Sequence, residues 1–192
     1  MTLASRVRPW LPLLPLLGLL SATYWLNQQA LPGPAKPESK NHDPDAVMEN
    51  FSATNLNEQG LPDFIMAATK LMHYPDDDST TLDDPRVTML SPGKPDIHIT
   101  AEHGTISSKG EDMYLRDNVK VLRAASAQQG QMTLQTQYLH IAPNQDLADT
   151  DRAVTIVDPN NIVHAIGMEM NSKTRILKLL SQVRSEYVPN KP

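Results

Sequence analysis

The stretch that decides the fold runs from Ala101 to Val119 and reads AEHGTISSKGEDMYLRDNV. Small or apolar residues stand at its start and three, five and eighteen positions further on, at Gly104, Ile106 and Val119. The same offsets recur twice downstream, from Thr136 at Leu139, Ile141 and Val154, and from Ala165 at Met168, Met170 and Val183. A fainter copy begins at Ala68 with Leu71. Repeats of roughly 30 to 35 residues are typical of stacked units that cannot bury their apolar faces alone.

Each unit contains short runs in which apolar and polar residues alternate, which is the period of a β-strand. Such runs are residues 97–101, 119–121, 132–136 and 162–170, and turn-forming residues separate them, as at 91–95, 108–110 and 158–161. The first two repeat positions, three residues apart, have opposite parity, so we expect a β-bulge or a bend between them. The sequence therefore predicts an all-β domain of repeated strand pairs over residues 49–188.

The apolar residues of the last run, residues 176–187, fit both the period of a strand and the period of a helix. Leu177, Leu179, Val183 and Tyr187 share one face of a strand, whereas Ile176, Leu180, Val183 and Tyr187 share one face of a helix. The repeat places a strand here, and we follow the repeat.

The N-terminal segment is the one strongly apolar stretch of the chain. Residues 10–26 carry no charge over 17 residues, which just suffices to span a bilayer. Arg6 and Arg8 precede the run and no basic residue follows before Lys36, so the positive-inside rule places residues 1–9 in the cytoplasm. The alternative is a cleaved signal peptide, although no A-x-A-like cleavage site is present. We expect a retained transmembrane anchor over residues 10–26.

The segment that follows the anchor reads as a spacer. Residues 31–46 are rich in proline and charge and have almost nothing apolar, so a linker over residues 27–48 cannot bury a core. We expect it to be an extended linker, and residues 189–192 to be a C-terminal tail.

Composition limits the possible chemistry. The chain has 192 residues, a net charge of −5 and no cysteine, so it has no disulfide, thiolate metal site or thiol nucleophile. The sequence has no basic stripe of the kind that binds nucleic acid. It also has no nucleotide-binding or hydrolase motif. A metal site at His98 and His103 is conceivable, but polar strand faces are the simpler interpretation. The acidic residues 76–78 lack the glycine and distal glutamate of a calcium loop.

Several segments taken together resemble the LptC family, the bitopic inner-membrane component of the lipopolysaccharide export bridge. These segments are residues 51–60, 73–80, 101–104, 150–156, 167–170 and 179–184, and the single N-terminal span adds to the likeness. The resemblance implies a twisted, half-open antiparallel β-jellyroll in the periplasm. It also implies that the LptB2FG ABC transporter loads the chain with lipopolysaccharide, and that an LptA-like periplasmic protein receives it. The chain itself would need no cofactor and would not be an enzyme.

A lipid conduit needs a continuous apolar lining, because apolar burial is what holds acyl chains out of water. We expect that lining at Ile99, Ala101, Leu115, Val119, Val121, Met132, Leu134, Ile141, Val154, Ile156, Ile166, Met168, Met170, Leu177, Leu179 and Val183. By resemblance, the strand edges that meet partners lie at Phe51 and Leu56 toward the transporter, and at Leu177, Leu179, Val183 and Tyr187 toward the LptA-like protein. For any single residue, ordinary sandwich core is an equal interpretation.

Two other functions stay open from the sequence. One is a membrane-anchored scaffold that recruits bridge proteins by strand addition without holding lipid. The other is a periplasmic carbohydrate-active or metal enzyme that would use His98, His103 and Asp76.

Overall fold

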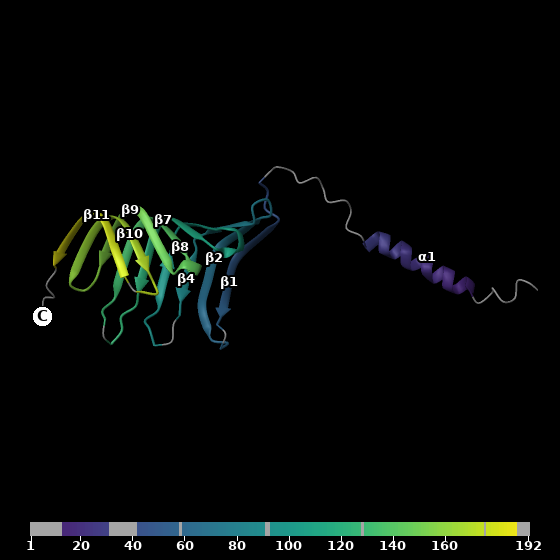
Figure 1. Cartoon of the computed structure of the whole chain (residues 1–192), viewed down its shortest axis with the longest axis horizontal. Coiled ribbons are helices and arrows are strands. Elements are labelled where there is room, and N and C mark those ends of the chain that lie inside the picture. Colours follow the sequence, from purple (N-terminus) through teal and green to yellow (C-terminus); the bar gives the residue numbers. More distant parts are fainter. Residues whose placement is uncertain are drawn as a thin grey trace, which may run out of the picture. The chain divides into compact units, whose positions relative to one another are not determined.

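The structure, a computed structural model, describes residues 13–30, 42–57, 59–90, 93–127, 129–174 and 176–187. The chain divides into two units, Met1–Asn41 and His42–Pro192. The first contains the helix α1 (Leu13–Ala30), and the second contains an 11-stranded sheet (Figure 1). Its strands are β1 (Ala46–Leu56), β2 (Pro62–Tyr74), β3 (Ser79–Asp83), β4 (Arg86–Met89), β5 (Ile97–Thr100), β6 (His103–Ile106), β7 (Met113–Arg123), β8 (Met132–Ala142), β9 (Leu147–Val157), β10 (Asn161–Asn171) and β11 (Ile176–Tyr187).

The helix α1 covers most of the expected anchor, while residues 10–12 lie outside the described part of the chain. No helix within the described residues is both long enough and apolar enough to cross a membrane. The transmembrane anchor and its orientation therefore stay predictions. Half of the expected linker and the whole C-terminal tail lie outside the described residues, and β1 begins at Ala46, inside the segment expected to be linker.

All strand pairs of the sheet are antiparallel, which confirms the predicted all-β class. Residues 176–187 form β11, so the strand interpretation of this run is confirmed over the helical one. Two long strands each pair with two short strands along one side: β2 with β4 and β3, and β7 with β5 and β6. One half of β2 and of β7 thus pairs with one short strand, and the other half pairs with another. The sheet therefore has two walls, which diverge from a common bend.

The bend lies where the sequence repeat predicts it. In β8 and β9 the register shifts between Thr136 and His140, and in β10 it shifts between Ile166 and Met168. Gly167 has a φ of +79° at that point, a conformation open to glycine at little cost. In the copy that starts at Ala101, the irregularity is the break between β5 and β6. The expected bulge or bend between the first two repeat positions is thus confirmed.

The sheet does not close on itself. Strand β1 pairs with β2 alone and β11 with β10 alone, and these edge strands lie at opposite ends of the sheet (Figure 1). An open antiparallel sheet leaves unpaired backbone N–H and C=O groups at each edge. Two walls with free edges are what the expected half-open arrangement of repeated strand pairs requires.

Candidate functional site

One wall of the interior carries an unbroken row of apolar side chains. Its members face one another in register from strand to strand, because antiparallel pairing places directly opposed residues on the same face. From β2 to β10 the row is Met66, Val87, Ile99, Val121, Leu134, Ile156 and Val163. We call it the first row.

The other wall carries a matching second row. From β1 to β8 it consists of Met48, Leu71, Leu82, Gly104, Leu115 and Leu139, and it continues in β9 to β11 with Thr150, Met168 and Leu179. Gly104 leaves little room for a side chain: a Cβ there would lie 3.2 Å from Pro85 and 3.4 Å from both Leu82 and Leu115, so the neighbours would have to shift by a few tenths of an ångström. Because Gly104 has no side chain, the backbone of β6 can lie close to the side chains of Leu82 and Leu115 in the second row.

The two rows pack against each other. Ile99 and Leu134 of the first row belong to the same buried cluster as Leu115 and Met168 of the second. The described buried side chains are apolar apart from Thr136 and Thr150. This apolar interior offers a surface for acyl chains or for protein core, and its flexible methionine side chains can adapt to a guest.

The expected lining residues fall into three groups. Eight are buried in the shared cluster: Ile99, Ala101, Leu115, Val119, Leu134, Val154, Ile156 and Met168. Four are partly buried and packed against it: Val121, Met132, Ile141 and Leu179. Met170 is half-buried, and Ile166, Leu177 and Val183 are 38%, 39% and 52% exposed. That any of these residues contacts lipid remains a prediction.

Several buried interior residues were not among the residues that the sequence predicted for the lining. Leu82, Val87, Leu139 and Ala165 are all buried. The repeat already marked Leu139 and Ala165, as its second and first positions, so that signal was available. Leu82 and Val87 lie in the short strands β3 and β4, where too few residues alternate to reveal a period.

The apolar interior reaches the solvent at the two edge strands. In β1, Met48 and Leu56 are 51% and 56% exposed, and Phe51 is half-buried. In β11 nearly every side chain is exposed, and Tyr187 reaches 72%. The residues expected to meet partners thus lie on unpaired edges, although no partner is present to test that role.

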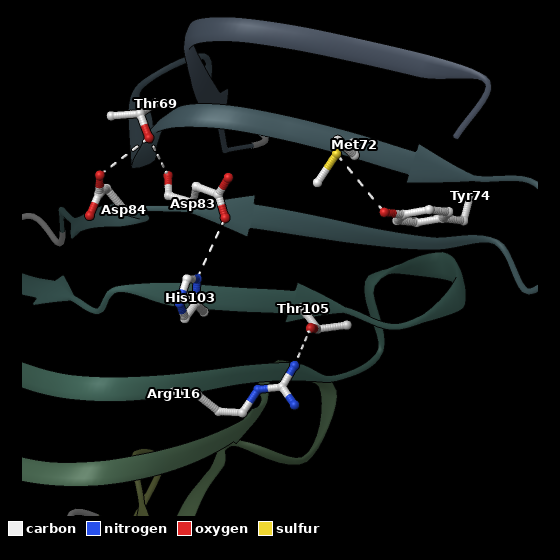
Figure 2. A network of polar contacts seen from close by, with 8 residues as sticks. All are labelled: Thr69, Met72, Tyr74, Asp83, Asp84, His103, Thr105 and Arg116. Atoms are coloured by element: carbon white, nitrogen blue, oxygen red, sulfur yellow. Dashed lines mark hydrogen bonds and ion pairs between the residues drawn. The ribbon is translucent and has the colours of Figure 1, made fainter. Parts of the chain in front are cut away.

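The outer face of the sheet is polar, and Figure 2 shows part of it. His103 Nδ1 lies 3.5 Å from Asp83 Oδ1, and Arg116 donates to Thr105 Oγ1 at 2.9 Å. His98 instead contacts Thr88 Oγ1 at 3.0 Å, so the conceivable metal pair has separate partners. Among the described residues, the group whose ligand atoms lie within 4.8 Å of one another is His42, Asp76 and Asp77, and all three are exposed.

A histidine clamp crosses the middle of this face. His140 in β8 places Nε2 2.7 Å from Asp112 Oδ1 and Nδ1 2.8 Å from Asp149 Oδ1, and its ring stacks on Tyr114. With a carboxylate at each ring nitrogen, both nitrogens donate only when the imidazole is protonated. Burial lowers the pKa of His140, but the hydrogen bonds to Asp112 and Asp149 outweigh it, so that the pKa is raised above 6.5.

The clamp predicts a pH-dependent stability. Because the folded pKa of His140 lies above its unfolded value, the protonated clamp stabilises the fold fully below about pH 6.5, and this contribution is lost as the pH rises through the folded pKa. We expect His140→Gln to lower the free energy of unfolding by roughly 1 kcal/mol near pH 6, since these side chains are partly exposed. Urea unfolding of both proteins at two pH values measures this, and an equal difference near pH 9 would contradict it.

Comparisons with known proteins bear on this site. A sequence model of the family described as "Lipopolysaccharide-assembly, LptC-related" matches residues 13–188. Among solved structures, the chain is similar to that of LptH from Pseudomonas aeruginosa, described as the LptA-homologous periplasmic component of its lipopolysaccharide transport device. The TM-score is 0.44 at 9% identity, over 76% of this chain and 94% of that one. A comparison with curated proteins gives no match.

Proposed function

Since this chain belongs to the LptC-related family of lipopolysaccharide-assembly proteins and so has a role in lipopolysaccharide transport, we propose that its β-domain carries the lipid through its interior. The acyl chains lie between the first and second rows, and the sugar part stays in solvent. The observation that carries this is that the first row is apolar from β2 to β10, while the second row, apolar apart from Thr150, extends from the β1 edge to the β11 edge. Burial of apolar area at roughly 25 cal/mol per Å2 favours such a surface over water.

The two free edges suit partners built on strands. A partner that adds a strand to an edge satisfies the unpaired backbone groups and prolongs the apolar rows. In this proposal the LptB2FG transporter delivers lipid at the β1 edge, and an LptA-like periplasmic protein continues the conduit from β11. The chain lies at the inner membrane as a single-pass protein with its β-domain in the periplasm, and it carries out no catalytic step itself.

A second candidate function is a scaffold that joins the same partners without holding lipid. It is favoured by one observation: members of the two rows pack in one buried cluster, with Leu115 and Leu139 only 1% and 2% exposed. For lipid to enter, the walls must part, starting from the exposed edges. The two functions make different predictions for the interior.

Photo-crosslinking separates the two functions. We expect a photo-reactive amino acid at Ile156, in the first row, to trap lipopolysaccharide in cells that contain the transporter. The same group at Val157, the next residue of β9 and 39% exposed, is the matched control and should trap none. Lipid adducts at Val121 and Leu179 as well would trace the path along the interior. Partner adducts at β1 and β11 without any lipid adduct inside would favour the scaffold.

A further inference from the structure

Arg123 is a cation on the inward face of the sheet. It is the last residue of β7, and it follows Val119 and Val121 at the two-residue spacing that keeps side chains on one face. Its partners in register are Ile97 in β5 and Met132 in β8. Both are partly buried and packed against the apolar cluster. The guanidinium group thus lies at the rim of the interior, two residues from Val121 of the first row.

The hydrogen bonding of this group is incomplete. Nη2 donates to the Gly130 carbonyl at 3.3 Å, whereas Nε is buried and has no partner among the described residues. Arg123 also makes no ion pair within the described part of the chain. A buried donor of a charged group that lacks an acceptor costs free energy, because it has lost its water. Among the described residues, none supplies an acceptor that would offset this cost at Nε.

The nearby carboxylate of Asp158 does not pair with the positive charge of Arg123. Arg123 is close enough to Asp158 to help hold the pKa of that carboxyl below its usual value, after the larger effects of Asn160 and Asn161. The oxygens of Asp158 are bound elsewhere, by the backbone N–H groups of Asn160 and Asn161 at 2.8 and 2.9 Å and by the Asn161 side chain. A positive group without its own anion therefore faces the mouth of an apolar interior.

We propose that Arg123 binds a phosphate group of the lipid whose acyl chains lie between the two rows. This inference rests on the proposed function and names the polar part of the ligand. A planar guanidinium offers paired N–H donors that match phosphate oxygens, and a phosphate supplies the acceptor that Nε lacks. An amphiphile with acyl chains in the interior brings its headgroup to the rim, where Arg123 lies.

The test compares two lipids that differ only in phosphate. Diphosphorylated lipid A and its dephosphorylated form carry the same acyl chains, so they bury the same apolar surface. For the full chain in a non-ionic detergent, we expect the phosphorylated lipid to bind about tenfold more tightly. In Arg123→Gln this ratio should fall to near one, with the affinity for the dephosphorylated lipid unchanged. Arg123→Lys should retain part of the preference, because it keeps the charge without the planar fork.

Arg116→Gln is the matched control, since Arg116 lies on the same strand but donates to Thr105 on the outer face. It should leave the preference intact. A preference that survives Arg123→Gln would overturn the inference, and so would an equal loss of both lipids, which indicates a structural role. Inorganic phosphate is a further probe: if it binds on its own, in an Arg123-dependent way, as tightly as the phosphorylated lipid does, the site is one for a free anion and the lipid assignment fails.

The inference and the proposed function fail in different ways. If the wild-type chain binds both lipids equally, the interior still holds lipid and only the role of Arg123 is wrong. If it binds neither lipid, the proposed function itself is wrong.

Discussion

Replacement of Leu115 with alanine is expected to lower the free energy of unfolding by about 3 kcal/mol. Leu115 is 1% exposed and lies in the second row between Gly104 and Leu139, its partners in register. Gly104 has no side chain that could move into the space, so the cavity left by the leucine stays largely empty. A loss of this size is a large share of the stability of an ordinary domain.

Urea unfolding followed by circular dichroism measures the effect. Leu180→Ala is the matched control, because Leu180 is 54% exposed and removal of the same atoms there should cost well under 1 kcal/mol. Equal losses for the two variants would mean that the two rows do not form the stabilising core. A variant of Leu115 that keeps its stability but gains lipid would instead indicate that the interior opens readily.

Gly167→Ala is the second change for which we expect a large effect, about 2–4 kcal/mol. Two costs combine at this position. The φ of +79° is unfavourable for any residue with a Cβ, and that Cβ would lie 2.9 Å from Leu180 Cδ1 and 3.1 Å from Leu180 Cβ. Gly167 lies at the register shift between β10 and β9, and Leu180 belongs to β11, so the variant should also loosen the pairing of β11 with β10.

Gly60→Ala separates the two costs. Gly60 has nearly the same φ, +76°, but nothing lies within 4 Å of a Cβ built there, so only the backbone cost of roughly 1–2 kcal/mol remains. Leu180→Ala added to Gly167→Ala should recover part of the difference by removing the nearer contact. If Gly167→Ala costs no more than Gly60→Ala, then the contact with Leu180 does not constrain the bulge.

The class of fold and the position of its bends followed from the sequence. Alternation with period two is a local property of a strand that buries one face, so it can be read without knowledge of the partner strand. The repeat added the bend, because Thr136 and Leu139 are both buried at a spacing that a flat strand cannot bury on one face. The match of the family to residues 13–188 agrees with the resemblance.

Which side chains face inward was decided only in part by the sequence. Ile166, Met168 and Met170 share one parity and were all expected inside, but Ile166 is exposed whereas Ala165 and Met168 are buried. The extra residue of the bulge at Gly167 reverses the alternation there. A bulge can be expected from a repeat, but the residue at which it occurs depends on the register with both neighbouring strands.

The sequence by itself determined a repeated β-domain with no cysteine chemistry, because composition and short-range periodicity suffice for that. Only the tertiary structure showed that β11 keeps its apolar residues exposed apart from Leu179, since exposure depends on whether another strand covers the edge. It also placed the charged Arg123 beside Ile97 and Met132, and the His140 clamp between Asp112 and Asp149. These contacts join residues distant in sequence, and their pairing is fixed by the register of the whole sheet rather than by any one strand.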